Sequence, residues 1–107
     1  MADDVYELHA RVCQALSSPV RLRILDQLRD GERSVKHLVA AVGASQPNLS
    51  LHLKVLAQGG VVLRRQEGTA AYYRVACPEV FQAIDILRGI LTRKLTKEDR
   101  MLRRTPQ

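Results

Sequence analysis

A helix pattern over residues 46–58 constrains the fold more than any other feature of the sequence. Leucine recurs along it at spacings of four and three, at Leu49, Leu53 and Leu56, which predicts a buried stripe on one face. Ser45 stands where a helix N-cap belongs, and a Gly-Gly pair follows the last turn and ends the helix. The opposite face contains no acidic residue. Such a neutral-to-basic face suits contact with phosphate groups and base edges.

A β-hairpin is predicted directly after this helix. Residues 61–66 and 70–75 are rich in Val, Leu and Tyr, and Glu67-Gly68-Thr69 separates them. Two β-prone segments joined by a short Gly-containing link are typical of antiparallel strands with a turn.

Four further helices are predicted from the spacing of apolar residues. The first covers residues 3–16, the second begins with Pro19 after the N-cap Ser18, and the third lies between Ser34 and Gly43. The last runs from Pro78 to about Leu95. Four helices, a hairpin and a fifth helix in this order predict a mainly α fold, the winged helix-turn-helix.

The charge balance indicates a polyanionic partner. The 107 residues include 17 Lys and Arg against 11 Asp and Glu, so the formal net charge is +6. Only four aromatic residues are present, Tyr6, Tyr72, Tyr73 and Phe81. Proteins that bind single strands stack successive bases on aromatic side chains, so this composition favours a duplex.

The apolar stripes of the first and fifth helices indicate a second subunit. They comprise Val5, Leu8, Val12 and Leu16 in the first helix, and Val80, Ile84, Leu87 and Leu91 in the fifth. One domain of this size has too little core to cover both stripes, so we expect a homodimer.

Three sequence motifs carry a family resemblance. They are Ala-Leu-Ser-Ser-Pro-Val-Arg-Leu-Arg-Ile-Leu at 15–25, Ser-Gln-Pro-Asn-Leu-Ser-Leu-His-Leu-Lys-Val-Leu at 45–56, and Gly-Val-Val at 60–62 with Tyr-Tyr-Arg at 72–74. In this order the chain resembles the ArsR/SmtB (arsenic-repressor) family of small dimeric winged-helix transcriptional regulators, over roughly residues 10–95. The resemblance implies a homodimer joined mainly through the first and fifth helices. It also implies a fourth helix in the DNA major groove, a wing along the backbone or minor groove, and repression relieved by an inducer.

Candidate DNA-binding residues lie on the fourth helix and the hairpin: Ser45, Gln46, Pro47, Asn48, Ser50, Leu51, His52, Lys54, Arg64 and Arg65. The amides can pair with adenine, the serines can reach a base or phosphate, leucine suits a thymine methyl group and lysine suits a phosphate. His52 borders the leucine stripe, so it either orients the helix or touches a phosphate. By strand alternation one of the two arginines should face DNA, and the alternative is that both are solvated.

The metal sites of the family are absent from this sequence. Where the family's arsenic- and lead-type site has cysteines, this chain has residues 34–39, which contain none. Where its zinc-type site needs Asp and His residues, this chain offers Cys77 and Glu79, then Ile90 and Arg93. The resemblance therefore supplies no inducer.

The two cysteines are the remaining candidate sensor residues. Cys13 shares a helix face with His9, and with Cys77 they could form a three-ligand soft site for arsenite, zinc or copper(I). A second possibility is a thiol switch that joins the cysteines by oxidation or persulfide. A third is that Cys13 is simply buried and Cys77 is a turn residue. The Cys77-Pro78 pair also matches a dipeptide of some haem-responsive proteins.

Together these features predict a cytoplasmic, dimeric repressor that binds a palindromic operator in double-stranded DNA, with no membrane segment. Residues 1–95 are expected to form the DNA-binding and dimerisation domain, and residues 96–107 a basic C-terminal extension. The alternative is a winged-helix module that binds a protein and no specific DNA sequence. An enzyme is not expected, because no Ser-His-Asp, metal-hydrolase or phosphate-loop constellation is found.

Overall fold

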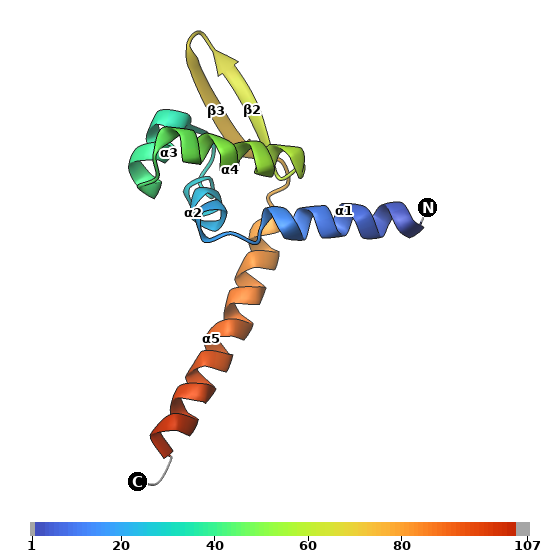
Figure 1. Ribbon diagram of the computed structural model, residues 1–107, viewed down its shortest axis with the longest axis vertical. Coiled ribbons are helices and arrows are strands. Elements are labelled where there is room, and N and C mark those ends of the chain that lie inside the picture. Colours follow the sequence, from blue (N-terminus) through green and yellow to red (C-terminus); the bar gives the residue numbers. More distant parts are fainter. Residues whose placement is uncertain (1, 105–107) are drawn as a thin grey trace. The chain divides into compact units, whose positions relative to one another are not determined.

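The computed structural model describes residues 2–104 and divides into two compact units, one ending at Cys77 and the other beginning at Pro78. In chain order the elements are α1 (Ala2–Ala15), α2 (Pro19–Gln27), β1 (Arg33–Ser34), α3 (Val35–Val42), α4 (Gln46–Gln58), β2 (Val62–Glu67), β3 (Ala70–Val75) and α5 (Val80–Arg104). Figure 1 shows that β2 and β3 form a hairpin that projects beyond α3 and α4. The first unit is therefore a winged helix-turn-helix, as predicted.

Serine caps begin α2, α3 and α4. The side-chain oxygens of Ser18, Ser34 and Ser45 each accept a hydrogen bond from the backbone N–H three residues later, at 3.3, 3.0 and 3.3 Å. Gly43 ends α3 with a φ of 79°, a conformation that other residues rarely adopt. The predicted bounds of α4 are confirmed, because both its cap and its terminating glycine are local signals.

The sheet has three strands in the order β1-β3-β2, whereas the sequence predicted only two. In β1, Arg33 pairs with Tyr73 and Ser34 with Tyr72. The prediction missed β1 because a strand of two residues has no periodicity, and its partner lies far along the chain. This extra pairing attaches the base of the wing to the segment before α3.

The core of the first unit is a cluster of side chains from the helices and the base of the wing. Its fully buried members are Ile24, Leu25, Leu38, Leu49, Leu53, Leu56 and Val62. The leucine stripe of α4 is confirmed. Ile24 was not predicted to be buried, and it lies on the inner face of α2 beside Leu25. Burial of this stripe leaves the opposite face of α4 toward solvent.

The fifth helix is longer than predicted and begins two residues later than Pro78. It runs from Val80 to Arg104, so most of the segment expected to be a basic C-terminal extension is helical. The residues after Leu95 include Lys, Glu, Arg and Met, which are good helix formers. Residues 105–107 of the expected extension lie outside the described part of the chain. Within the described part, no helix combines the length and apolar character that a membrane crossing requires.

Candidate DNA-binding face and sensor residues

The outer face of α4 presents polar and apolar groups to solvent. Its exposed members include Gln46, Pro47, Asn48, Ser50, Leu51 and Lys54. Leu51 is 64% exposed, which is unusual for a leucine on a helix whose other leucines are buried. An exposed apolar group among amides and a lysine suits a surface that meets base edges and methyl groups.

Ser45 is exposed but already has a structural role. Its Oγ accepts a hydrogen bond from the Asn48 N–H, so the hydroxyl hydrogen and one lone pair remain for another partner. The cap fixes the first turn of α4, in which Gln46 and Asn48 lie. Ser45 therefore positions the amides even before any contact of its own with DNA.

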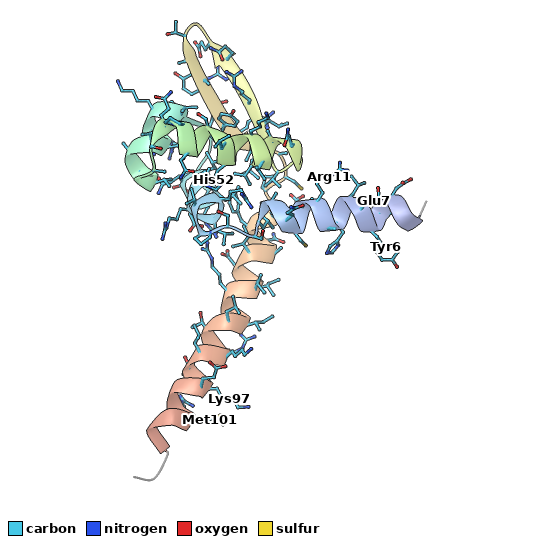
Figure 2. The ribbon with its side chains drawn as sticks, in the orientation of Figure 1. Tyr6, Glu7, Arg11, His52, Lys97 and Met101 are labelled. Atoms are coloured by element: carbon cyan, nitrogen blue, oxygen red, sulfur yellow. The ribbon has the colours of Figure 1, made fainter. Side chains whose placement is uncertain are left out.

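His52 faces the helices of its own unit. Its Nδ1 lies 3.2 Å from Nη1 of Arg21 in α2, and the ring is half-buried between α4 and α2 (Figure 2). Of the two roles considered for His52, this contact supports orientation of the helix.

The two wing arginines differ in their partners. Arg65 donates to both carboxylate oxygens of Glu32, at 2.7–3.2 Å, and to Glu67 at 2.7 Å, and its guanidinium lies 4.6 Å from the centre of the Tyr72 ring. The hydrogen bonds from Arg65 hold the pKa of Glu32 below its ordinary value. Glu32 precedes β1, so this ion pair ties the wing to its base.

Arg64 lies on the other face of β2. It is paired across the hairpin with Tyr73, which is buried, so Arg64 shares the face that packs on the helices. Its guanidinium is exposed and donates to the side-chain oxygen of Gln66, a neutral partner. Of the two arginines, Arg64 is therefore the one with its charge available to a phosphate.

A hollow of about 470 Å³ separates the tip of the wing from the N-terminal ends of α3 and α4. It is lined by Ser34, Val35, Lys36, Val39, Gln46, Thr69, Ala70 and Ala71. Lys36 is exposed and is the one charged residue of this lining. Lys36 was not predicted from the sequence, because only the return of the wing tip to α3 makes its position relevant.

The cysteines do not assemble a metal site within one chain. Among the described residues, no group of three or more His, Cys, Asp and Glu side chains could hold a metal ion, so His9, Cys13 and Cys77 are not brought together as ligands. Both cysteines are exposed and neither forms a disulfide. Within one chain Cys13 is exposed and not buried as an apolar core residue. It lies on α1 away from the core, because Ala15 and not Cys13 faces inward.

Comparison with known proteins places the chain in a family. The family described as "Bacterial regulatory protein, arsR family" matches residues 18–63. The HTH-type transcriptional regulator Rv0081 of Mycobacterium tuberculosis is 36% identical over 96 residues, covering 89% of this chain and 84% of that protein. The chain belongs to the arsR family of bacterial transcriptional regulators. The expectation that it is a regulator and not an enzyme is thereby confirmed.

Other relatives and solved structures agree with this assignment to the arsR family. The repressor SmtB of M. tuberculosis is 38% identical over 73 residues, or 68% of this chain and 54% of SmtB. The crystal structure of Rv0081 covers 88% of this chain and 95% of its own, with a TM-score of 0.77 and 37% identity. A homodimeric winged helix-turn-helix DNA-binding domain from Mycobacterium bovis, solved by NMR, has a TM-score of 0.78 and 35% identity, covering 88% and 87%.

Proposed function

We propose that this arsR-family regulator is a homodimeric repressor that binds a palindromic operator in duplex DNA and is released by an inducer. The observation that carries the proposal is the capped helix α4, whose exposed amides and Lys54 stand beside a wing with an available arginine. In this role α4 enters the major groove, with Gln46 and Asn48 on base edges and Leu51 on a thymine methyl group. Ser50, Lys54 and Arg64 contact phosphates, and Pro47 starts the helix against the groove.

The hollow beside α4 supports this docking. A major groove and the neighbouring minor groove are separated by one sugar-phosphate strand. If α4 occupies the first groove and the wing reaches the second, that strand passes between them, where the hollow lies. Its lining contains a lysine, two hydroxyl groups and an amide but no carboxylate, which suits a phosphodiester. Lys36 is then an additional phosphate contact.

The apolar faces of α1 and α5 support a dimer. Each of the two helices, taken by itself, leaves large apolar side chains exposed: Val5, Tyr6 and Leu8 on α1, and Ile86, Leu87, Ile90, Leu91, Leu95 and Met101 on α5. Figure 2 shows Tyr6 on α1 and Met101 on α5. Apolar surface of this extent is typical of a subunit interface. With two subunits, the recognition helices lie about 34 Å apart and read a two-fold site, and residues 1–95 act as one functional domain.

The inducer in this proposal is a thiol-reactive or soft-metal signal that acts through Cys13 and Cys77. Both thiols are exposed, so an oxidant, a persulfide or arsenite can reach them. Any metal-type site would need ligands from both subunits, because one chain does not bring His9 and the cysteines together. The regulator acts in the cytoplasm, where its DNA partner is found.

Selection from a random-sequence duplex pool tests the proposed function. We expect the protein to enrich a palindromic sequence and to bind it at least about 10³-fold more tightly than random duplex at the same salt concentration. Analytical ultracentrifugation should show a dimer bound to one duplex. Equally weak binding to every sequence would contradict the proposal and favour a winged-helix module whose partner is a protein.

A further inference from the structure

The last turn of α1 is attached to α2 and α4 by one side chain. Arg21, in the first turn of α2, donates from Nε to the carbonyl oxygen of Ala15 at 2.7 Å, and from Nη2 to that of Gln14 at 3.0 Å. Its third nitrogen, Nη1, lies 3.2 Å from Nδ1 of His52 in α4. The final carbonyls of a helix have no partner within it, so the guanidinium caps α1 while it reaches α4.

The chemistry of this contact fixes both partners. A guanidinium can only donate, so Nδ1 of His52 accepts and the ring hydrogen is on Nε2. Arg21 is itself held in place, because its backbone N–H donates to the Ser18 Oγ at 3.3 Å. The planar fork of Arg21 thus joins three helices with little freedom to rotate.

A second attachment joins the same turn of α1 to the end of α4. Ala15 is 1% exposed, and a Cβ added at Gly59 would stand only 3.0 Å from the Ala15 Cβ. This second attachment borders a hollow of about 450 Å³, which Arg11, Gln14, Val55 and Gln58 help to line. Both attachments meet α1 in its last turn and reach α4 at His52 and at Gly59, so each has a large share in setting the angle between the two helices.

We propose that Arg21 is a positioning residue that sets the orientation of the DNA-reading helix α4 relative to α1, acting through Nδ1 of His52. This inference rests on the proposed function, in which α1 belongs to the subunit interface and α4 enters the major groove. A change in α1 then reaches α4 through the Arg21–His52 contact. His52 affects DNA affinity by orienting α4 and not by touching DNA itself.

Four variants test this inference. R21M removes the donors, H52L removes the acceptor, R21M/H52L removes both, and H52N returns an acceptor oxygen to the place of Nδ1. R23M is the matched control, since Arg23 is an exposed arginine of the same helix. Affinity is measured by fluorescence anisotropy with the duplex that the wild-type protein selects. Dimerisation is measured by ultracentrifugation, and folding by circular dichroism.

We expect R21M and H52L each to weaken DNA binding about tenfold, which is a typical coupling between two sites. The double variant should bind no more weakly than either single variant, because both changes remove the same contact. H52N should bind within about twofold of wild type, and R23M should bind as wild type does. If the contact served only to stabilise the fold, R21M and H52L would have lower melting temperatures, and H52N would not restore the affinity for DNA. If R21M fails to fold, H52L and H52N still decide the matter, because they leave the cap on α1 intact.

Two results would overturn the inference. Multiplicative losses in the double variant would show that His52 contacts DNA independently of Arg21. An H52N variant as weak as H52L would show that the acceptor at Nδ1 is irrelevant. In both cases normal selection of an operator by the wild type leaves the proposed function standing. If the wild type selects no duplex, the proposed function fails and this inference fails with it.

Discussion

Substitution of Arg64 by glutamine should reduce the salt dependence of DNA binding, whereas the same change at Arg65 should not. Arg64 has a neutral partner and lies on the wing face that packs on the helices. Arg65 has two carboxylate partners, Glu32 and Glu67, at 2.7 Å. A phosphate would have to displace these carboxylates to bind Arg65. The neighbouring arginines therefore form a matched pair with the same chemistry and different availability.

The expected size follows from counterion release. Each phosphate contact contributes about 0.9 to the slope of log affinity against log salt concentration. A dimer loses two contacts in R64Q, so the slope should fall by about 1.8. The ratio of the affinity at about 50 mM salt to the affinity at about 200 mM salt should therefore be roughly 12-fold smaller for R64Q than for wild type. R65Q should keep the wild-type slope, although loss of its ion pairs loosens the wing.

Anisotropy titrations at four or five salt concentrations measure these slopes. Each series uses the selected operator and a random duplex of equal length, because a phosphate contact affects both alike. An unchanged slope in R64Q together with a reduced slope in R65Q would refute the assignment. It would mean that the carboxylates release Arg65 when DNA arrives.

Three further predictions concern stability, sensing and pH. Leu53→Ala should lower the free energy of unfolding by about 2–5 kcal/mol, measured by urea denaturation, because its side chain is 1% exposed in the core. Cys13→Ser and Cys77→Ser should each abolish release of DNA by hydrogen peroxide or arsenite; a double variant that still responds as wild type would exclude the cysteines as sensors. Hydrogen bonding to Arg65 lowers the pKa of the Glu32 carboxyl from 4.5. The stabilisation of the wing by this ion pair is therefore complete above that pH and is lost as the pH falls through the folded-state pKa. The protection factors of the wing amides, which are corrected for the intrinsic exchange rate at each pH, should therefore fall in wild type on acidification below about pH 4.5, and E32Q should show the lower protection already at neutral pH.

The parts of the fold that the sequence predicted are those with local signals. The helix α4 has a serine cap, a leucine stripe and a terminating glycine within fifteen residues, 45–59, so its bounds follow from short-range interactions. The strand β1 has no such signal, because its two residues depend on Tyr72 and Tyr73 for their conformation. The end of α5 was placed too early, since a helix rich in good formers continues after its apolar stripe weakens.

The site was predicted in outline and completed only by contacts between distant residues. Alternation along β2 predicted that one of Arg64 and Arg65 faces DNA but could not choose between them. The choice depends on Glu32, which is 33 residues from Arg65 in the chain. The role of His52 depends likewise on Arg21, 31 residues away. No periodicity connects such residues, so tertiary structure alone separates the cations that hold the fold from those that remain available.

This distinction limits what the net charge can contribute to DNA binding. Arg21 is engaged by backbone carbonyls and an imidazole, and Arg65 by carboxylates. Of the basic residues at the proposed interface, Lys36, Lys54 and Arg64 are exposed, and Arg64 donates to the neutral side chain of Gln66. Three such cations in each subunit of a dimer give about six phosphate contacts and a slope near −5.4. A much steeper slope would mean that the exposed arginines and lysines of α5, such as Lys97 (Figure 2), also lie on DNA.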